Sequence, residues 1–123
     1  MIIRKITENG KEYEFINNSR NTRTGFAHDT TLFIDGREYG SATAIYYNRT
    51  WESYIYQTVM KRCIDDIITE EYNRFVANFK AQNNIKRLTA EKRAEAEKEF
   101  FALAEIQDLK KVYKALDLNE YGY

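Results

Sequence analysis

The spacing of apolar residues changes once along this chain, near residues 48–50. Before that point apolar and polar residues alternate, as in Lys11–Phe15, which is typical of half-buried strands. Over 50–81 the apolar residues recur every three or four positions, which is typical of an amphipathic helix. Strands followed by helices favour an α+β fold, in which helices cover an antiparallel sheet.

The chain length allows one domain. With 123 residues, it can bury a core without help from disulfides or metal. We therefore predict a single domain over 1–123. Its sheet part, 1–48, is an antiparallel meander of three to four strands, and its helical part, 50–117, holds two to four helices.

Asp35-Gly36 is the clearest local signal, because this dipeptide favours a type I′ hairpin turn. It joins strands predicted over Phe26–Ile34 and Arg37–Tyr47, with Ile34 opposite Arg37 and His28 opposite Thr43. The face richer in large apolar groups is the expected core side: Phe26, His28, Thr30, Leu32, Ile34, Tyr39, Ser41, Thr43, Ile45 and Tyr47. The other face has the small Ala42 and Ala44, which a helix could approach closely.

Two other segments before residue 26 are turn or loop candidates. Glu8–Lys11 contains Asn-Gly and predicts a turn, and the polar stretch Asn17–Gly25 predicts a loop.

The helical part carries two apolar stripes. The first stripe comprises Tyr56, Val59, Met60, Cys63, Ile64 and Ile67, and the second comprises Ile68, Tyr72, Phe75, Val76 and Phe79. They are rotated by roughly 120°, and an unbroken helix here would span about 46 Å. We expect a bend, a break or a change of packing partner near Thr69–Glu71. Thr89 can cap a further helix to about Ala104, and Glu105–Leu116 predicts a last one.

Charge and composition exclude several classes of function. Lys and Arg number 19 and Asp and Glu number 19, so the net charge gives no long-range attraction to nucleic acid or acidic membranes. One cysteine cannot form an internal disulfide, and Cys63 with the single His28 cannot build a zinc site. No apolar run has the length of a membrane span. We expect a cytoplasmic protein without membrane contact, cofactor or metal.

The residues give little support to catalysis. His28 and Asp29 are adjacent on a predicted strand, so their side chains point to opposite faces and cannot form a dyad. Ser41 is expected near His28, but no oxyanion motif accompanies them. We expect a structural histidine, an inert core thiol at Cys63, and a protein that is not an enzyme.

An aromatic stretch, Tyr46–Tyr56, lies where the strand pattern gives way to the helix pattern. By helical projection Trp51, Tyr54 and Ile55 lie away from the first stripe, and exposed aromatic clusters mark partner surfaces. The alternative is a first helical turn buried on both sides. The residues predicted to bind a protein partner are Arg23, Tyr47, Arg49, Trp51, Tyr54 and Ile55.

A nucleic-acid interface is the alternative function, with nucleic acid bound as part of a complex. Loop arginines and a basic cluster would contact phosphates while tyrosines stack on bases. The residues concerned are Arg20, Arg23, Lys86, Arg87, Lys92 and Arg93. Self-association as a homodimer, through the Ile68–Phe79 stripe or the last helix, is a further expectation.

The chain resembles small orphan proteins of bacteriophages and mobile elements, including anti-CRISPR proteins. The resemblance lies in its size, its many residues with AT-rich codons, its α+β pattern and the stretch Tyr47–Tyr54. It implies a protein that inhibits a host defence complex by binding a host or phage protein.

Overall fold

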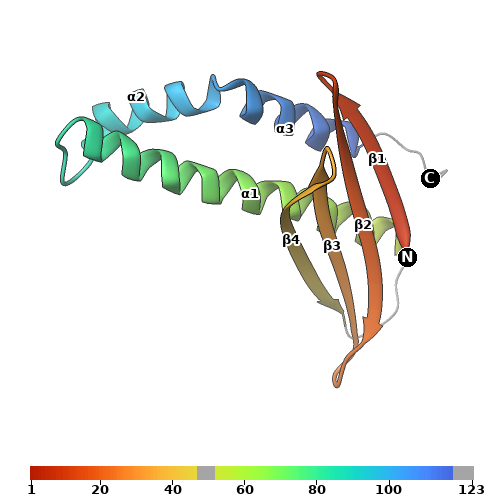
Figure 1. Ribbon diagram of the computed structural model, residues 1–123. Coiled ribbons are helices and arrows are strands. Elements are labelled where there is room, and N and C mark those ends of the chain that lie inside the picture. Colours follow the sequence, from red (N-terminus) through yellow and green to blue (C-terminus); the bar gives the residue numbers. More distant parts are fainter. Residues whose placement is uncertain (47–51, 118–123) are drawn as a thin grey trace.

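The computed structural model describes residues 1–46 and 52–117, with the side chains of 1–45 and 55–117 (Figure 1). Four strands precede three helices, which confirms the predicted α+β fold. The elements are β1 (Ile2–Glu8), β2 (Lys11–Asn21), β3 (Phe26–Ile34), β4 (Arg37–Tyr46), α1 (Glu52–Gln82), α2 (Ala90–Phe101) and α3 (Ala104–Ala115). Figure 1 shows the helices on one side of the sheet, with α1 crossing the sheet and extending beyond it.

Antiparallel neighbours form the sheet in the order β1-β2-β3-β4, which is the expected meander. Both predicted turns are present. Asn9 and Gly10 have φ of 52° and 76°, and Asp35 and Gly36 have φ of 49° and 82°, as a type I′ turn needs.

The predicted loop over Asn17–Gly25 is wrong in its first part, because β2 continues to Asn21. Asn17 is fully buried within this strand. Its side-chain amide donates to the Ile2 carbonyl and its oxygen accepts from the Thr30 hydroxyl. A polar residue is therefore tolerated in the core because it is hydrogen-bonded there.

A β-bulge at Tyr39 changes the predicted pairing of β3 with β4. Leu32 lies opposite Gly40 but Phe33 lies opposite Glu38, so His28 faces Ala44 and not Thr43. The core side is therefore correct for His28, Thr30 and Leu32 but wrong for β4. Residues of β4 that we expected inside are exposed, namely Tyr39, Ser41, Thr43 and Ile45.

Close packing of α1 explains why β4 turns its small residues inward. A Cβ atom placed on Gly40 would lie 2.8 Å from Ile67 Cγ1. Ala42 is buried and Ala44 half-buried on the same face. The sheet therefore presents Gly40, Ala42 and Ala44 to the helix, which is the alternative that the small residues had suggested.

α1 is one helix of 31 residues, so the bend or break expected near Thr69–Glu71 is replaced by the third alternative, a change of packing partner. Its first stripe lies in the core with the sheet. In its second stripe Tyr72 and Phe75 contact Phe100 of α2, with ring centroids 5.2 Å and 5.6 Å apart. This part of α1, 68–82, together with α2 forms a helical arm that projects beyond the sheet (Figure 1).

The last two helices begin near the expected positions. Thr89 caps α2 as predicted, and its hydroxyl accepts from the Lys92 amide at 3.2 Å. α3 packs on β1, where Arg4 Nη2 donates to the Ala115 carbonyl at 3.2 Å. The core lies between sheet and helices and includes Tyr13, Phe15, Leu32, Val59, Met60, Cys63, Ile64, Phe100, Val112 and Leu116.

Within 1–46 and 52–117, no helix is both long and apolar enough to cross a bilayer. The same residues contain no group of three or more His, Cys, Asp or Glu side chains that could hold a metal ion.

Candidate functional site

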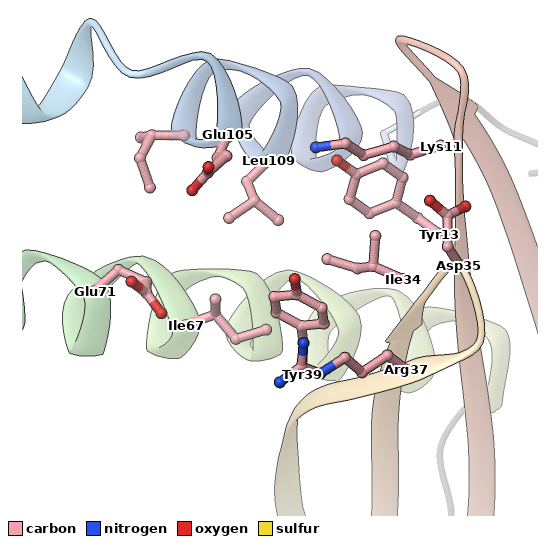
Figure 2. A pocket seen from close by; sticks show the side chains of 11 residues that line it. Lys11, Tyr13, Ile34, Asp35, Arg37, Tyr39, Ile67, Glu71, Glu105 and Leu109 are labelled. Carbon is pink, nitrogen blue, oxygen red and sulfur yellow. The ribbon is translucent and has the colours of Figure 1, made fainter.

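A cavity of about 470 Å³ opens where the two hairpin turns approach α1 and α3 (Figure 2). We name it the hairpin cleft. It is lined by Lys11, Tyr13, Ile34, Asp35, Arg37, Tyr39, Ile67, Glu71, Glu105, Ile106 and Leu109.

The floor of the hairpin cleft is apolar and firmly packed. Ile67 comes from α1 and Leu109 from α3, each 6% exposed, and Ile106 is 3% exposed. Tyr13 from β2 lies beside them, and its burial, with the nearby charge of Asp108, raises the pKa of its phenol to about 12. Such a floor can accept an apolar group without rearranging.

Buried Asp108 organises the hairpin end of the cleft. Its Oδ2 accepts from Asn9 Nδ2 at 3.2 Å and lies 4.0 Å from Lys11 Nζ. The other turn is fixed by Asp35, whose Oδ1 accepts from the Glu12 amide at 2.9 Å. The two turns are therefore tied to the rest of the fold by side chains as well as by backbone pairing.

The β-bulge gives the hairpin cleft its most exposed aromatic group. Tyr39 is the extra residue of β4, and bulges commonly redirect a side chain in this way. Figure 2 shows Tyr39 and Arg37 beside Ile67 at the mouth of the cleft, and Tyr39 is 50% exposed. Tyrosine and arginine around an apolar centre are typical of protein interfaces.

Both cations of the hairpin cleft lie at one end, where the carboxylates of Asp35 and Asp108 lie with them. Lys11 and Arg37 lie at its hairpin end, whereas Glu71 of α1 and Glu105 of α3 lie toward the helical arm (Figure 2). The end toward the helical arm is therefore acidic, and it is complementary to a basic group of a partner.

Most residues predicted to bind a protein partner lie outside what the structure describes. Tyr47, Arg49 and Trp51 fall outside the described residues, and Tyr54 has only its backbone described, within α1. Ile55 was expected to face outward, and this is wrong, because it is 1% exposed in the hydrophobic core.

Arg23 is exposed in the turn between β2 and β3. The basic residues of the alternative function do not form one surface. Arg20 lies on β2, where its Nε is 2.9 Å from Asp29 Oδ2.

The remaining four basic residues lie at the tip of the helical arm. Lys86 and Arg87 follow α1, and Lys92 and Arg93 are in the first turns of α2. Figure 1 places this tip far from the turn between β2 and β3. A single stretch of nucleic acid would have to span the whole molecule to contact both sets.

His28 is a buried, hydrogen-bonded residue on the core side of β3. Its Nδ1 is 2.9 Å from the hydroxyl of Ser19, and its ring stands nearly perpendicular to that of Tyr56 at 5.6 Å. The neighbour that we expected, Ser41, instead pairs with Thr31. Asp29 points to the other face as expected, where it also accepts from Thr43.

Cys63 is fully buried, and this burial raises the pKa of its thiol to about 12. A thiol that keeps its proton is a poor nucleophile, in line with the inert core role expected for it.

The residues of the hairpin cleft were not predicted as a site. One signal points toward it, since an isolated glycine within a strand pattern, here Gly40, indicates a bulge or a close backbone approach. Neither family models, nor curated proteins, nor solved structures gave any match to this chain.

Proposed function

We propose that this protein is a non-enzymatic interaction module that docks a partner protein at the hairpin cleft. The observation that supports this most is the bulge that brings Tyr39, with Arg37, to the mouth of a cleft with an apolar floor. An exposed tyrosine over a preformed apolar floor buries a large area with little loss of rotamer freedom.

The resemblance to small phage proteins suggests the kind of partner. We propose a component of a host defence complex, bound by the hairpin cleft together with the aromatic stretch that contains Trp51 and Tyr54. The cleft lies at the Arg37 end of β4 and the aromatic stretch follows its Tyr46 end, so a partner that contacts both patches must span the length of this strand.

The test uses tagged protein as bait in a host extract and then with the purified candidate partner. Tyr39→Ala is expected to weaken binding at least tenfold, whereas Glu38→Ala, its neighbour on the outer face, changes binding less than twofold. Trp51→Ala with Tyr54→Ala tests the second patch in the same assay. Melting temperatures are compared for all variants.

Two results would contradict the proposal. One is a partner retained equally by wild type, Tyr39→Ala and the Trp51→Ala, Tyr54→Ala double variant. The other is loss of binding that always accompanies a large drop in melting temperature, since it would assign these residues to folding.

A further inference from the structure

A second depression lies between α1 and α3 and shares no residue with the hairpin cleft. It has a volume of about 500 Å³ and is lined by Asp65, Ile68, Phe101, Lys110, Tyr113 and Lys114. We name it the lysine groove. Ile68, Phe101 and Tyr113 form an apolar floor, and these three side chains are half-buried.

Two lysines on one face of α3 stand over this floor. Lys110 and Lys114 are four residues apart, so they are neighbours one helical turn apart, with about 6 Å between their Cβ atoms. The ammonium group of Lys110 lies 4.2 Å from the centre of the Phe101 ring. Neither lysine takes part in an ion pair with a described side chain, whereas Lys111 pairs with Glu8 at 3.9 Å.

A single acidic side chain lines the groove. Burial, with the neighbouring charge of Asp66, raises the pKa of the Asp65 carboxyl. Asp65 lies on the α1 side of the groove, and the two lysines on the α3 side outnumber it. An apolar floor with cations along one side is complementary to a ligand that is apolar on one face and acidic beside it.

We propose that the lysine groove is a docking site for an acidic amphipathic helix of a partner protein. Carboxylates four residues apart on such a helix match the spacing of Lys110 and Lys114, while its apolar stripe covers Phe101 and Ile68. A third helix laid against α1 and α3 would also complete the packing of a helix pair that is open on this side. This site is independent of the hairpin cleft.

The probe is a labelled synthetic helix with leucines at i, i+3, i+4 and i+7 and glutamates flanking this stripe. Its binding to the full chain is followed by fluorescence anisotropy. Lys110→Glu with Lys114→Glu is expected to weaken binding at least tenfold, and Phe101→Ala at least fivefold. Lys98→Glu with Lys111→Glu has the same total charge and is expected to change binding less than twofold.

Several outcomes would overturn this proposal. One is that the acidic helix fails to bind, and another is that the same helix with lysines in place of glutamates binds equally well. A third is that the two double variants weaken binding by the same factor. If the chain bound phosphatidylglycerol vesicles in preference to the acidic helix, the groove would be assigned to a membrane surface. A dimer that Lys110→Glu with Lys114→Glu dissociates would assign it to a second copy of the chain. Unchanged melting temperatures separate each result from misfolding.

Discussion

Single residues set the distance between the sheet and α1. Gly40 allows the close approach of Ile67, and the bulge at Tyr39 places Gly40 on the core face. The close approach of Ile67 and the position of Gly40 on the core face both depend on one extra residue in β4, Tyr39. The same residue supplies the exposed ring of the hairpin cleft, so packing and proposed function share a cause.

Gly40→Ala is expected to lower the free energy of unfolding by about 1–3 kcal/mol, because the new methyl group would overlap Ile67. Urea denaturation measures this, with Ser41→Ala on the exposed face as the control. In an Ile67→Ala background the same Gly40→Ala substitution should cost less, since neighbouring substitutions are coupled. Equal stability of Gly40→Ala and wild type would show that helix and sheet do not pack this closely.

The buried phenol of Tyr13 lowers the free energy of unfolding at alkaline pH. Its burial raises the pKa of the phenol to about 12 in the folded chain, against about 10 when unfolded. Between these values the unfolded chain releases a proton that the folded chain keeps, so stability falls as pH rises. From pH 8 to pH 11 the loss due to this group is about 1 kcal/mol. Tyr13→Phe should remove that part of the pH dependence, and an unchanged profile would count against a buried hydroxyl.

At the scale of elements, the helical arm depends on aromatic contacts between α1 and α2. Phe100 is 1% exposed and contacts Tyr72 and Phe75, whereas most of α2 faces solvent. Phe15 and Leu32 lie in the sheet part of the same core cluster, which reaches the helical arm through Phe100. Regions held by few apolar contacts open more readily than the core.

Phe100→Ala is therefore expected to raise hydrogen exchange across the helical arm more than in β2 and β3. Removing a buried phenylalanine costs about 3–5 kcal/mol, which is enough to open an arm held by one cluster. Mass spectrometry of exchanged peptides measures this, with the exposed neighbour Glu99→Ala as the control. A uniform rise over strands and arm would instead mean that the arm and the sheet unfold together.

Local chemistry explains which elements the sequence could predict. The turns at Asn9-Gly10 and Asp35-Gly36 depend on residues that tolerate positive φ, and the cap of α2 depends on Thr89. The face of β4 could not be predicted from alternation, because the bulge reverses it after Tyr39. Asn17 also escaped prediction, because its hydrogen bonds to Ile2 and Thr30 come from other strands.

The same reasoning applies to the candidate site. Ile67 and Leu109 could be predicted as apolar helix residues, yet only the crossing of α1 and α3 over the hairpin turns brings them together. Ile55 was placed outside by its helical angle, but it lies in the core cluster with Tyr56 and Val59. Tertiary contacts, which periodicity does not encode, decide both cases.

At the scale of the whole molecule, α2 packs on part of the stripe that had suggested a homodimer, while Ile68 of that stripe lines the lysine groove. Phe79 is 6% exposed, and Tyr72 and Phe75 contact Phe100 of the same chain. A second copy docking on this stripe would have to displace α2. The aromatic rings of this part of the stripe thus find their contacts within one chain.

We therefore expect a monomer at micromolar concentration. Light scattering should give a mass near 14.6 kDa that does not change with dilution. Strand addition at the free edge of β4 is also hindered. Arg62 of α1 donates to the Thr43 carbonyl on that edge at 3.3 Å. A mass twice as large at all concentrations would show a self-association surface elsewhere.

The enclosed sulfur of Cys63 makes this chain convenient for spectroscopy. Maleimide dyes react with accessible cysteines, so the native residue, which is fully buried, should remain unlabelled. Cysteines engineered by Thr24→Cys and Lys86→Cys would then carry a donor and an acceptor at opposite ends of the molecule. Energy transfer between the two fluorophores would report directly on how far the tip of the arm moves when a partner is added.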